Sequence, residues 1–408
     1  MVVLQGLTKA DLAEILLPLS RVKEGKDPRT QAKYRAKQIF HWVYQRYVTE
    51  WDQMSDLSKE VRAWAKENIQ IASLSERTSQ QSQDGTHKFL WNTHDNKTIE
   101  SVIIPAALTS EEEKEQARER QQAYAGVESA ADLKSDHWTR LTACISSQVG
   151  CAMACKFCLT GIQGLDRHLQ AHEIVTQVLE LRRRAPITNI VFMGMGEPLH
   201  NLENTIKAIK ILLDDDGMNF SKRKITVSTS GIAPAIVELG KETDVQLAVS
   251  LNASEDKTRS EIMPVNKKWP IAELLKAVRQ YPLSQHRRVT FEYVLLASVN
   301  DSMDDAKRLV PLLRGISCKI NLIPFNVHSG TEFNRTPDVR VKEFQHYLLN
   351  QGFTTTVRIS RGRDILAACG QLRSIFGTAK GTEKHKDWKD APPASQIPLA
   401  QTSNPPLN

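Results

Sequence analysis

From residue 139 onwards, short apolar runs alternate with longer amphipathic runs. The strand-like runs lie at 140–146, 188–194, 224–230, 245–251, 288–296 and 319–325. Each strand and the helical run after it take roughly 35 residues, as in a βαβ unit. Near-continuous apolar strands are typical of a parallel sheet covered on both faces.

Eight such units would need ~250 residues or more, so six units fit the available length better. The pattern therefore predicts an α/β fold with an open, partial six-unit (β/α) barrel of the TIM type. A further strand-like run at 354–360 and a short helix around 366–376 complete it. By analogy with the full barrel, the chemistry is expected in the loops that follow the strands.

The first hundred residues have a different pattern. Residues 9–70 read as helices, with apolar and aromatic residues at helical spacing and basic residues between them. They predict either a plain helical bundle or an RNA-docking module with a basic outer face. Two strands are expected at 86–91 and 98–105. Glu100 shares strand parity with Val102 and Ile104, so it either has a partner or a task there or turns back to solvent.

Composition sets the domain boundaries and the expected compartment. The domains expected are a helical domain with a strand pair at 1–107, a charged insertion at 108–136, the barrel at 137–363, a C-terminal segment at 364–378 and a disordered tail at 379–408. The net charge of +7 permits a polyanionic partner. No apolar run reaches the ~18–20 residues of a membrane span, and the N-terminus does not read as a signal peptide. We therefore expect a cytoplasmic protein, in which the six cysteines serve metal binding, catalysis or plain burial.

Three of these cysteines are closely spaced after the first barrel strand, at Cys151, Cys155 and Cys158. Three clustered thiolates favour a soft metal centre. A 4Fe–4S cluster held by three thiolates keeps one iron open for a small molecule. A structural zinc site would need a fourth protein ligand, for which His168 is the nearest candidate. Chance clustering is the remaining alternative.

Polar residues also follow several other strands. Gly194-Met195-Gly196-Glu197-Pro198 comes at the end of the second strand, where glycines let a ligand approach the backbone and a carboxylate can accept from an ammonium group. The other residues expected at this end of the barrel are Ser228, Ser250, Leu251, Asn252 and Asn326. Each alone is ordinary loop chemistry, but together they would ring a site for a zwitterionic nucleoside.

The segments CAMACKFC, FMGMGEPL, STSG, SLNAS and IPFN resemble those of the RlmN/Cfr family of radical S-adenosylmethionine (SAM) methyltransferases. The resemblance continues through YRAKQIFHWVY, DGTHKFLW and ESVIIP and covers most of residues 30–376. It implies a radical SAM barrel with one 4Fe–4S cluster on Cys151, Cys155 and Cys158. It also implies that S-adenosylmethionine binds at Gly196, Glu197, Ser228, Ser250, Leu251, Asn252 and Asn326.

The resemblance further implies three catalytic residues. Cys369 matches the methyl-carrying cysteine, Cys144 the resolving cysteine and Glu100 the general base, whereas Cys318 reads as a buried strand residue. The implied reaction consumes two S-adenosylmethionine molecules, passes through an S-methylcysteine and a transient disulfide, and methylates carbon 2 of an adenosine in 23S ribosomal RNA and in the anticodon loop of transfer RNA. We expect a monomer served by a flavodoxin or ferredoxin. Methylation at carbon 8 and a zinc-containing RNA-binding assembly factor are the alternatives.

Overall fold

The computed structural model describes residues 1–20, 27–106, 140–284, 287–328, 331–358 and 360–372. The predicted charged insertion and the predicted tail lie outside these ranges. None of the helices within them combines the length and apolar character needed to cross a bilayer.

The N-terminal helices are α1 (Lys9–Leu16), α2 (Pro28–Phe40) and α3 (Lys59–Asn68). The N-cap residues of these helices are Thr8, Asp27 and Ser58. The side chain of each accepts a hydrogen bond from a backbone N–H group of the first turn. A π-helical turn, His41–Gln45, continues α2. For the described residues of 9–70, the predicted helical character is confirmed except in the turns between helices and at the end, where β2 (Ile69–Gln70) pairs with β1 (Val2–Val3).

The centre of the molecule is a ten-stranded sheet in the order β14-β13-β12-β11-β10-β9-β6-β5-β4-β3. Seven neighbouring strands are parallel: β6 (Leu141–Cys144), β9 (Asn189–Phe192), β10 (Ile225–Thr229), β11 (Gln246–Ser250), β12 (Val289–Leu295), β13 (Cys318–Pro324) and β14 (Thr355–Val357). They correspond to the six predicted strands and the additional strand expected at 354–360.

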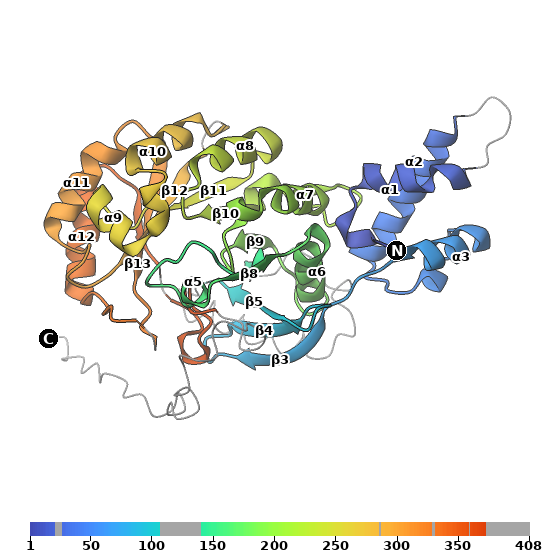
Figure 1. Ribbon diagram of the computed structural model, residues 1–408, viewed down its shortest axis with the longest axis horizontal. Helices are drawn as coiled ribbons and strands as arrows, with labels where there is room; N and C mark the ends of the chain where they lie inside the picture. Colours follow the sequence, from blue (N-terminus) through green and yellow to red (C-terminus); the bar gives the residue numbers. More distant parts are fainter. Residues whose placement is uncertain (21–26, 107–139, 285–286, 329–330, 359, 373–408) are drawn as a thin grey trace, which may run out of the picture.

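Helices cover the outer face of these parallel strands (Figure 1). They are α6 (Ala171–Arg182), α7 (Leu202–Leu213), α8 (Ala233–Thr243), α9 (Asp256–Ile262), α10 (Ile271–Gln280), α11 (Met303–Leu313) and α12 (Asp338–Asn350). The sequence pattern predicts all but α9. This helix is short and polar, and it has too few apolar residues to show a helical period.

Three antiparallel strands extend the sheet beyond β6: β5 (Thr98–Pro105), β4 (His87–Asn92) and β3 (Ser75–Gln81). The two predicted strands are β4 and β5. The third, β3, was not predicted because its residues are polar and nearly all exposed, which removes the alternation expected of a half-buried strand. The register opposes Val102 to Cys144, so alternate residues of β5 share the inner face with Cys144.

A small hairpin, β7 (Gln148–Gly150) and β8 (Leu165–His168), interrupts the path from β6 to α6. The cysteine loop, residues 151–158, and the short helix α5 (Leu159–Gln163) lie between its two strands. The prediction that the cysteines directly follow the first barrel strand is therefore wrong, because β7 intervenes. Gly150 has a φ of +77°, and a Cβ there would lie 1.9 Å from the carbonyl oxygen of Gly164. Only glycine allows this closure of the hairpin.

The inner face of the parallel strands differs from the expected continuous apolar surface. Its inward positions include Thr142, Asn189, Thr226 and Thr290, which line a cavity. The outer face is packed against helices, so the apolar character of the strands comes mainly from that side. The barrel interior is thus a partly polar cavity and not a filled core.

Candidate active site

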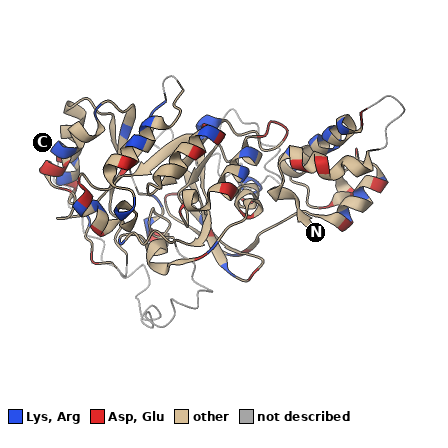
Figure 2. Cartoon of the chain, turned by 45° about the horizontal axis from the view of Figure 1, so that its top comes forward, with Lys and Arg blue, Asp and Glu red and all other residues tan. Residues whose placement is uncertain are grey.

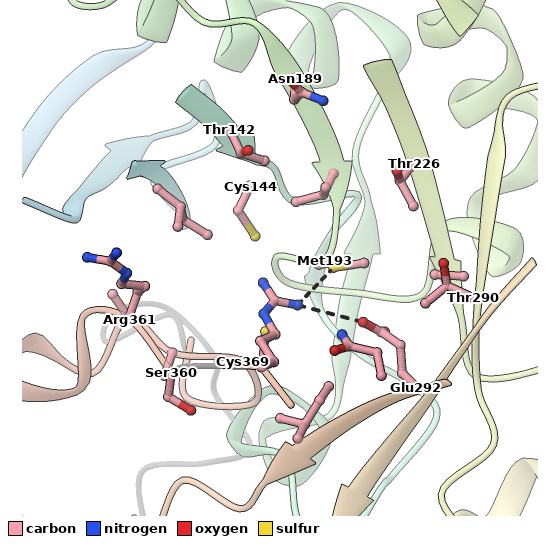
Figure 3. Close-up of a pocket in the computed structure, with 18 of the residues that line it drawn as sticks. Thr142, Cys144, Asn189, Met193, Thr226, Thr290, Glu292, Ser360, Arg361 and Cys369 are labelled. Atoms are coloured by element: carbon pink, nitrogen blue, oxygen red, sulfur yellow. Dashed lines mark hydrogen bonds and ion pairs between the residues drawn. The ribbon is translucent and has the colours of Figure 1, made fainter. Parts of the chain in front are cut away.

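The cavity inside the barrel has a volume of about 420 Å³. It is lined by residues of strands β5, β6 and β9–β14 and by the C-terminal segment. Figure 3 shows that Cys144, on β6, and Cys369, from the C-terminal segment, both face this cavity. The fold therefore brings together two cysteines from opposite ends of the barrel sequence.

Burial governs the chemistry of both thiols. It raises the pKa of Cys144 to about 12, and a thiolate at Cys369 would raise it further, which indicates that the two sulfurs lie within electrostatic reach. Burial also raises the pKa of Cys369, while the guanidinium of Arg358 opposes that shift. Both cysteines are therefore neutral thiols near pH 7. The structure records neither as part of a disulfide.

Arg358 joins this pair to the rest of the barrel. Its Nη1 lies 3.6 Å from Oε1 of Glu292 on β12, and Oε2 of Glu292 accepts a hydrogen bond from Ser228 Oγ at 3.0 Å. Sequence reasoning missed Arg358 and Glu292. A carboxylate in the middle of an otherwise apolar strand was the signal that could have revealed Glu292.

Glu100 is buried on β5, with 2% of its surface exposed. Its carboxylate lies 3.2 Å from the ammonium of Lys88 on β4, which is also buried. The alternative that Glu100 turns back to solvent is therefore wrong. Lys88 was not singled out from the sequence, because the pairing of β4 with β5 that brings it to Glu100 cannot be read from the sequence pattern.

The three cysteines of the loop are brought together but do not form a closed ligand set. Within the described ranges, no group of three His, Cys, Asp or Glu side chains has the arrangement that holds a metal ion. Burial raises the pKa of Cys155, and the charges of Cys151 and Cys158 raise it further, which indicates that the thiols lie close together. His168 instead contacts Gln148, its Nδ1 lying 2.9 Å from the amide nitrogen.

These thiols fit an iron–sulfur cluster better than structural zinc. Removing their protons creates negative charge that burial penalises, and a cationic soft metal centre offsets this cost. His168, the candidate for a fourth zinc ligand, contacts Gln148 instead, so the three thiols suit a cluster with one open iron.

The strand ends beside the cysteine loop carry the other predicted residues. Glu197 is buried and accepts hydrogen bonds from the backbone N–H groups of Ser230 at 2.7 Å and Leu199 at 3.0 Å. Burial nevertheless raises the pKa of Glu197, so a cation beside it would stabilise its charged form. At Gly196, φ is +99° and a Cβ would lie 2.5 Å from Cβ of Gln148, so glycine is required there.

Of the polar side chains at and near the remaining predicted positions, some form hydrogen bonds within the protein and others do not. Asn252 Oδ1 accepts from the backbone N–H of Val294 at 2.8 Å. Asn326 Oδ1 is buried with no hydrogen-bond partner among the described residues, and the same holds for Ser230 Oγ. Buried polar atoms of this kind need a partner, so they fit a ligand rich in polar groups such as S-adenosylmethionine.

Arg259, on α9, holds the backbone at these strand ends. Neither this residue nor its helix was predicted from the sequence. It is fully buried and donates hydrogen bonds to the carbonyl oxygens of Ser230, Ser250 and Leu251, at 2.6, 3.0 and 2.9 Å. The side chains of Ser250 and Leu251 are therefore set by a backbone that Arg259 fixes. Burial lowers the pKa of Arg259 to about 10, which still leaves it charged.

The C-terminal segment is fastened to the helix that follows the cysteine loop. The backbone N–H of Leu159 donates to Gly370 O at 2.8 Å, and Thr160 Oγ1 donates to Leu372 O at 2.6 Å. Cys369 is thereby held beside the loop that carries Cys158. The structure thus brings Cys144, Cys369 and Asn326 to one cavity and holds the cysteine loop next to the segment that carries Cys369. Cys318, by contrast, is a buried strand residue outside it, as expected.

Comparison with known proteins identifies the family of the chain. The family described as the radical SAM superfamily matches residues 145–310, and the ribosomal RNA large subunit methyltransferase N-terminal domain matches residues 29–71. The chain is 47% identical to the dual-specificity RNA methyltransferase RlmN of Geobacter sulfurreducens, over 93% of this chain and 94% of that protein. It is 43% identical to that of Syntrophotalea carbinolica, over 96% and 95%.

A solved structure agrees with these relatives. The crystal structure of a radical SAM methyltransferase from Sphaerobacter thermophilus superposes with a TM-score of 0.76 at 41% identity, covering 91% of this chain and 99% of that one. The chain belongs to the RlmN family of radical SAM methyltransferases.

Proposed function

We propose that this protein methylates carbon 2 of an adenosine in 23S ribosomal RNA and in the anticodon loop of transfer RNA. The observation that carries the proposal is the meeting of Cys144 and Cys369 in one cavity beside the cysteine loop. An RNA-binding protein with structural zinc has no need of two thiols that line one cavity.

The site suits a reaction that polar methyl transfer cannot perform. Carbon 2 of adenine lies between two nitrogens and is a poor nucleophile. The 4Fe–4S cluster and S-adenosylmethionine supply the methyl group and one-electron chemistry when bound. The protein's part is to hold the reacting groups and exclude water. In this proposal Cys151, Cys155 and Cys158 hold the cluster, and Glu197 receives the ammonium group of S-adenosylmethionine.

Cys369 would carry the methyl group, which would lose one hydrogen atom to the one-electron chemistry of the cofactors and become linked through the remaining methylene to carbon 2 of the base. The unpaired electron of this adduct would return to the same cofactors. Glu100 would then remove the proton from carbon 2 as general base. Cys144 would attack the sulfur of Cys369, so that a disulfide forms and the carbon–sulfur bond breaks. The electron pair of that bond stays with the carbon, which takes a proton to become a methyl group. An external thiol would reduce the disulfide before the next turnover.

The N-terminal helices fit a role in holding the RNA. Figure 2 shows basic residues along α2, and those on its exposed or half-buried surface are Arg29, Lys33, Arg35 and Lys37. Such a surface would contact phosphates without reading sequence. We further propose that the protein acts as a monomer in the cytoplasm, with a flavodoxin or ferredoxin as its electron donor.

The test is product analysis after anaerobic reconstitution with iron and sulfide. The enzyme, S-adenosylmethionine, a reductant and each RNA would be combined, and the digested nucleosides separated by mass spectrometry against authentic standards. We expect 2-methyladenosine in both RNAs. Formation of 8-methyladenosine would show that the protein methylates carbon 8 instead. The absence of any methylated adenosine would contradict the proposal.

A further inference from the structure

The barrel cavity has a polar belt that the reaction described above does not use. Thr142, Asn189, Thr226 and Thr290 each occupy the first or second position of their strand and line the cavity. Figure 3 shows them on the strands around Cys144 and Met193. Full barrels fill their interiors with branched apolar side chains, so a belt of hydroxyl and amide groups marks space for a polar occupant.

Exposure changes along the strands of the barrel. The belt residues at the amino ends are half-buried, whereas Glu197, Asn252 and Asn326 at the carboxyl ends are almost fully buried. The cysteine loop and the segment that carries Cys369 close the carboxyl end, where they are hydrogen-bonded to each other. Within the described part of the chain, the amino ends of the strands are therefore the more open side of the cavity.

Cations stand at that same end. Arg140 directly precedes β6, and Lys319 is the second residue of β13. Both side chains are exposed and line the cavity. Among the described residues neither forms an ion pair. Among its described residues, the lining includes the cationic side chains of Arg140, Lys319, Arg358 and Arg361 and the acidic side chain of Glu292, which faces Arg358. This charge balance favours an anionic ligand.

We propose that the target nucleotide reaches Cys144 and Cys369 through the amino-end opening of the barrel. The polar belt would surround the unstacked nucleoside, and Arg140 and Lys319 would bind the phosphates that flank it. The inference rests on the proposed RNA methylation and adds the route and the phosphate contacts. It places RNA and S-adenosylmethionine at opposite ends of one cavity, so that an unstacked base meets Cys369 from the side away from the cofactor.

The first test is charge reversal at the opening. Arg140→Glu and Lys319→Glu would be compared with Lys276→Glu, an exposed lysine on the outer helix α10. Binding of an RNA hairpin that contains the target adenosine would be measured at several salt concentrations. Each opening variant should lose at least threefold in affinity and reduce the slope of log K against log salt by about 0.7–0.9, the loss of one phosphate contact. Affinities and slopes equal to those of Lys276→Glu would overturn the assignment.

The second test blocks the cavity without changing charge. Thr290→Trp should abolish methylation of the RNA hairpin, whereas the S-methylation of Cys369, which needs no RNA, should persist at the wild-type level in peptide mass spectrometry. Wild-type RNA methylation by this variant would overturn the route. Failure of the wild-type enzyme to methylate RNA would instead contradict the proposed function. If the bulky side chain prevents folding, the charge-reversal variants decide the question.

Discussion

At the scale of single residues, Lys88 is a buried cation that pairs with the proposed general base. Its ammonium lies 3.2 Å from the Glu100 carboxylate and 3.5 Å from the carbonyl oxygen of Leu366, three residues before Cys369. A buried carboxylate without a cation tends to take up a proton, and a protonated Glu100 could not act as a base. Lys88 therefore places a positive charge beside the proposed base and ties the strand of Glu100 to the segment that carries Cys369.

Lys88→Met should slow the release of product from the covalent RNA adduct by about 100-fold, the typical contribution of a general base. Glu100→Gln should have a similar effect, and Lys88→Arg should restore most of the activity because it keeps the charge. The adduct is measured on denaturing gels as RNA that migrates with protein. Normal release by Lys88→Met, while Glu100→Gln accumulates the adduct, would show that Lys88 does not act through Glu100.

The second prediction concerns Cys144 and the pH dependence of the rate at which the covalent RNA adduct is released. Because burial raises its pKa to about 12, the fraction of reactive thiolate increases tenfold with each pH unit throughout the neutral range. Adduct formed at low pH and transferred to buffers of increasing pH should therefore decay with a log rate that has a slope of about one against pH. A rate independent of pH between roughly 6.5 and 8.5 would be inconsistent with Cys144 as the attacking group.

Sequence reasoning found the cysteines and the strand-end residues but not the residues that adjust their charge. Cysteines and glycine–glutamate pairs are recognisable in one dimension because their spacing is local. Lys88, Arg259, Glu292 and Arg358 act through strand pairing or through contacts between distant elements. Their function depends on the register of the sheet, which the apolar pattern does not determine between strands that are far apart in sequence.

At the scale of elements, the hairpin β7–β8 is fastened to its neighbours by Arg167. The guanidinium donates to both oxygens of Asp95, in the turn between β4 and β5, at 2.7 and 2.9 Å, and to both oxygens of Glu173 on α6 at 2.8 Å. It holds the pKa of the Asp95 carboxyl far below its usual range. One side chain thus joins the hairpin around the cysteine loop to the strands that carry Glu100.

Arg167→Met should lower the free energy of unfolding by about 3 kcal/mol, because it leaves the buried Glu173 without its cation. The matched control is Lys241→Met, which removes an exposed pair with Glu238 and should cost no more than about 0.5 kcal/mol. Urea denaturation followed by circular dichroism measures both. Equal losses in the two variants would show that the Arg167 network does not fasten the hairpin.

Among the elements, the repeated strands and helices of the barrel could be predicted because each has a clear apolar period. The edge strand β3, the hairpin β7–β8 and the helix α9 could not. Each is short or polar, and each is stabilised by neighbouring elements rather than by its own pattern. The hairpin and α9 lie beside the cysteine loop and the strand ends, whereas β3 is the outermost strand of the sheet.

At the scale of the whole molecule, the barrel provides two separate ends. The cysteine loop and the strand ends form a closed, buried side for the cofactors, and the segment with Cys369 is hydrogen-bonded to it. The antiparallel strands β3–β5 widen the sheet next to Cys144 and bring Glu100 to the same face. The basic N-terminal helices lie to one side of the barrel (Figure 1). This arrangement suits a large RNA whose target base alone enters the barrel.

The central claim is that Cys369 carries the methyl group to RNA and that Cys144 releases the product. The most direct measurement is made on Cys144→Ala, reconstituted anaerobically and incubated with S-adenosylmethionine, reductant and RNA. After nuclease and trypsin digestion, mass spectrometry should find an adenosine joined through one carbon to the peptide that contains Cys369. Free methylated RNA at the wild-type rate, or a link to any other residue, would contradict the claim.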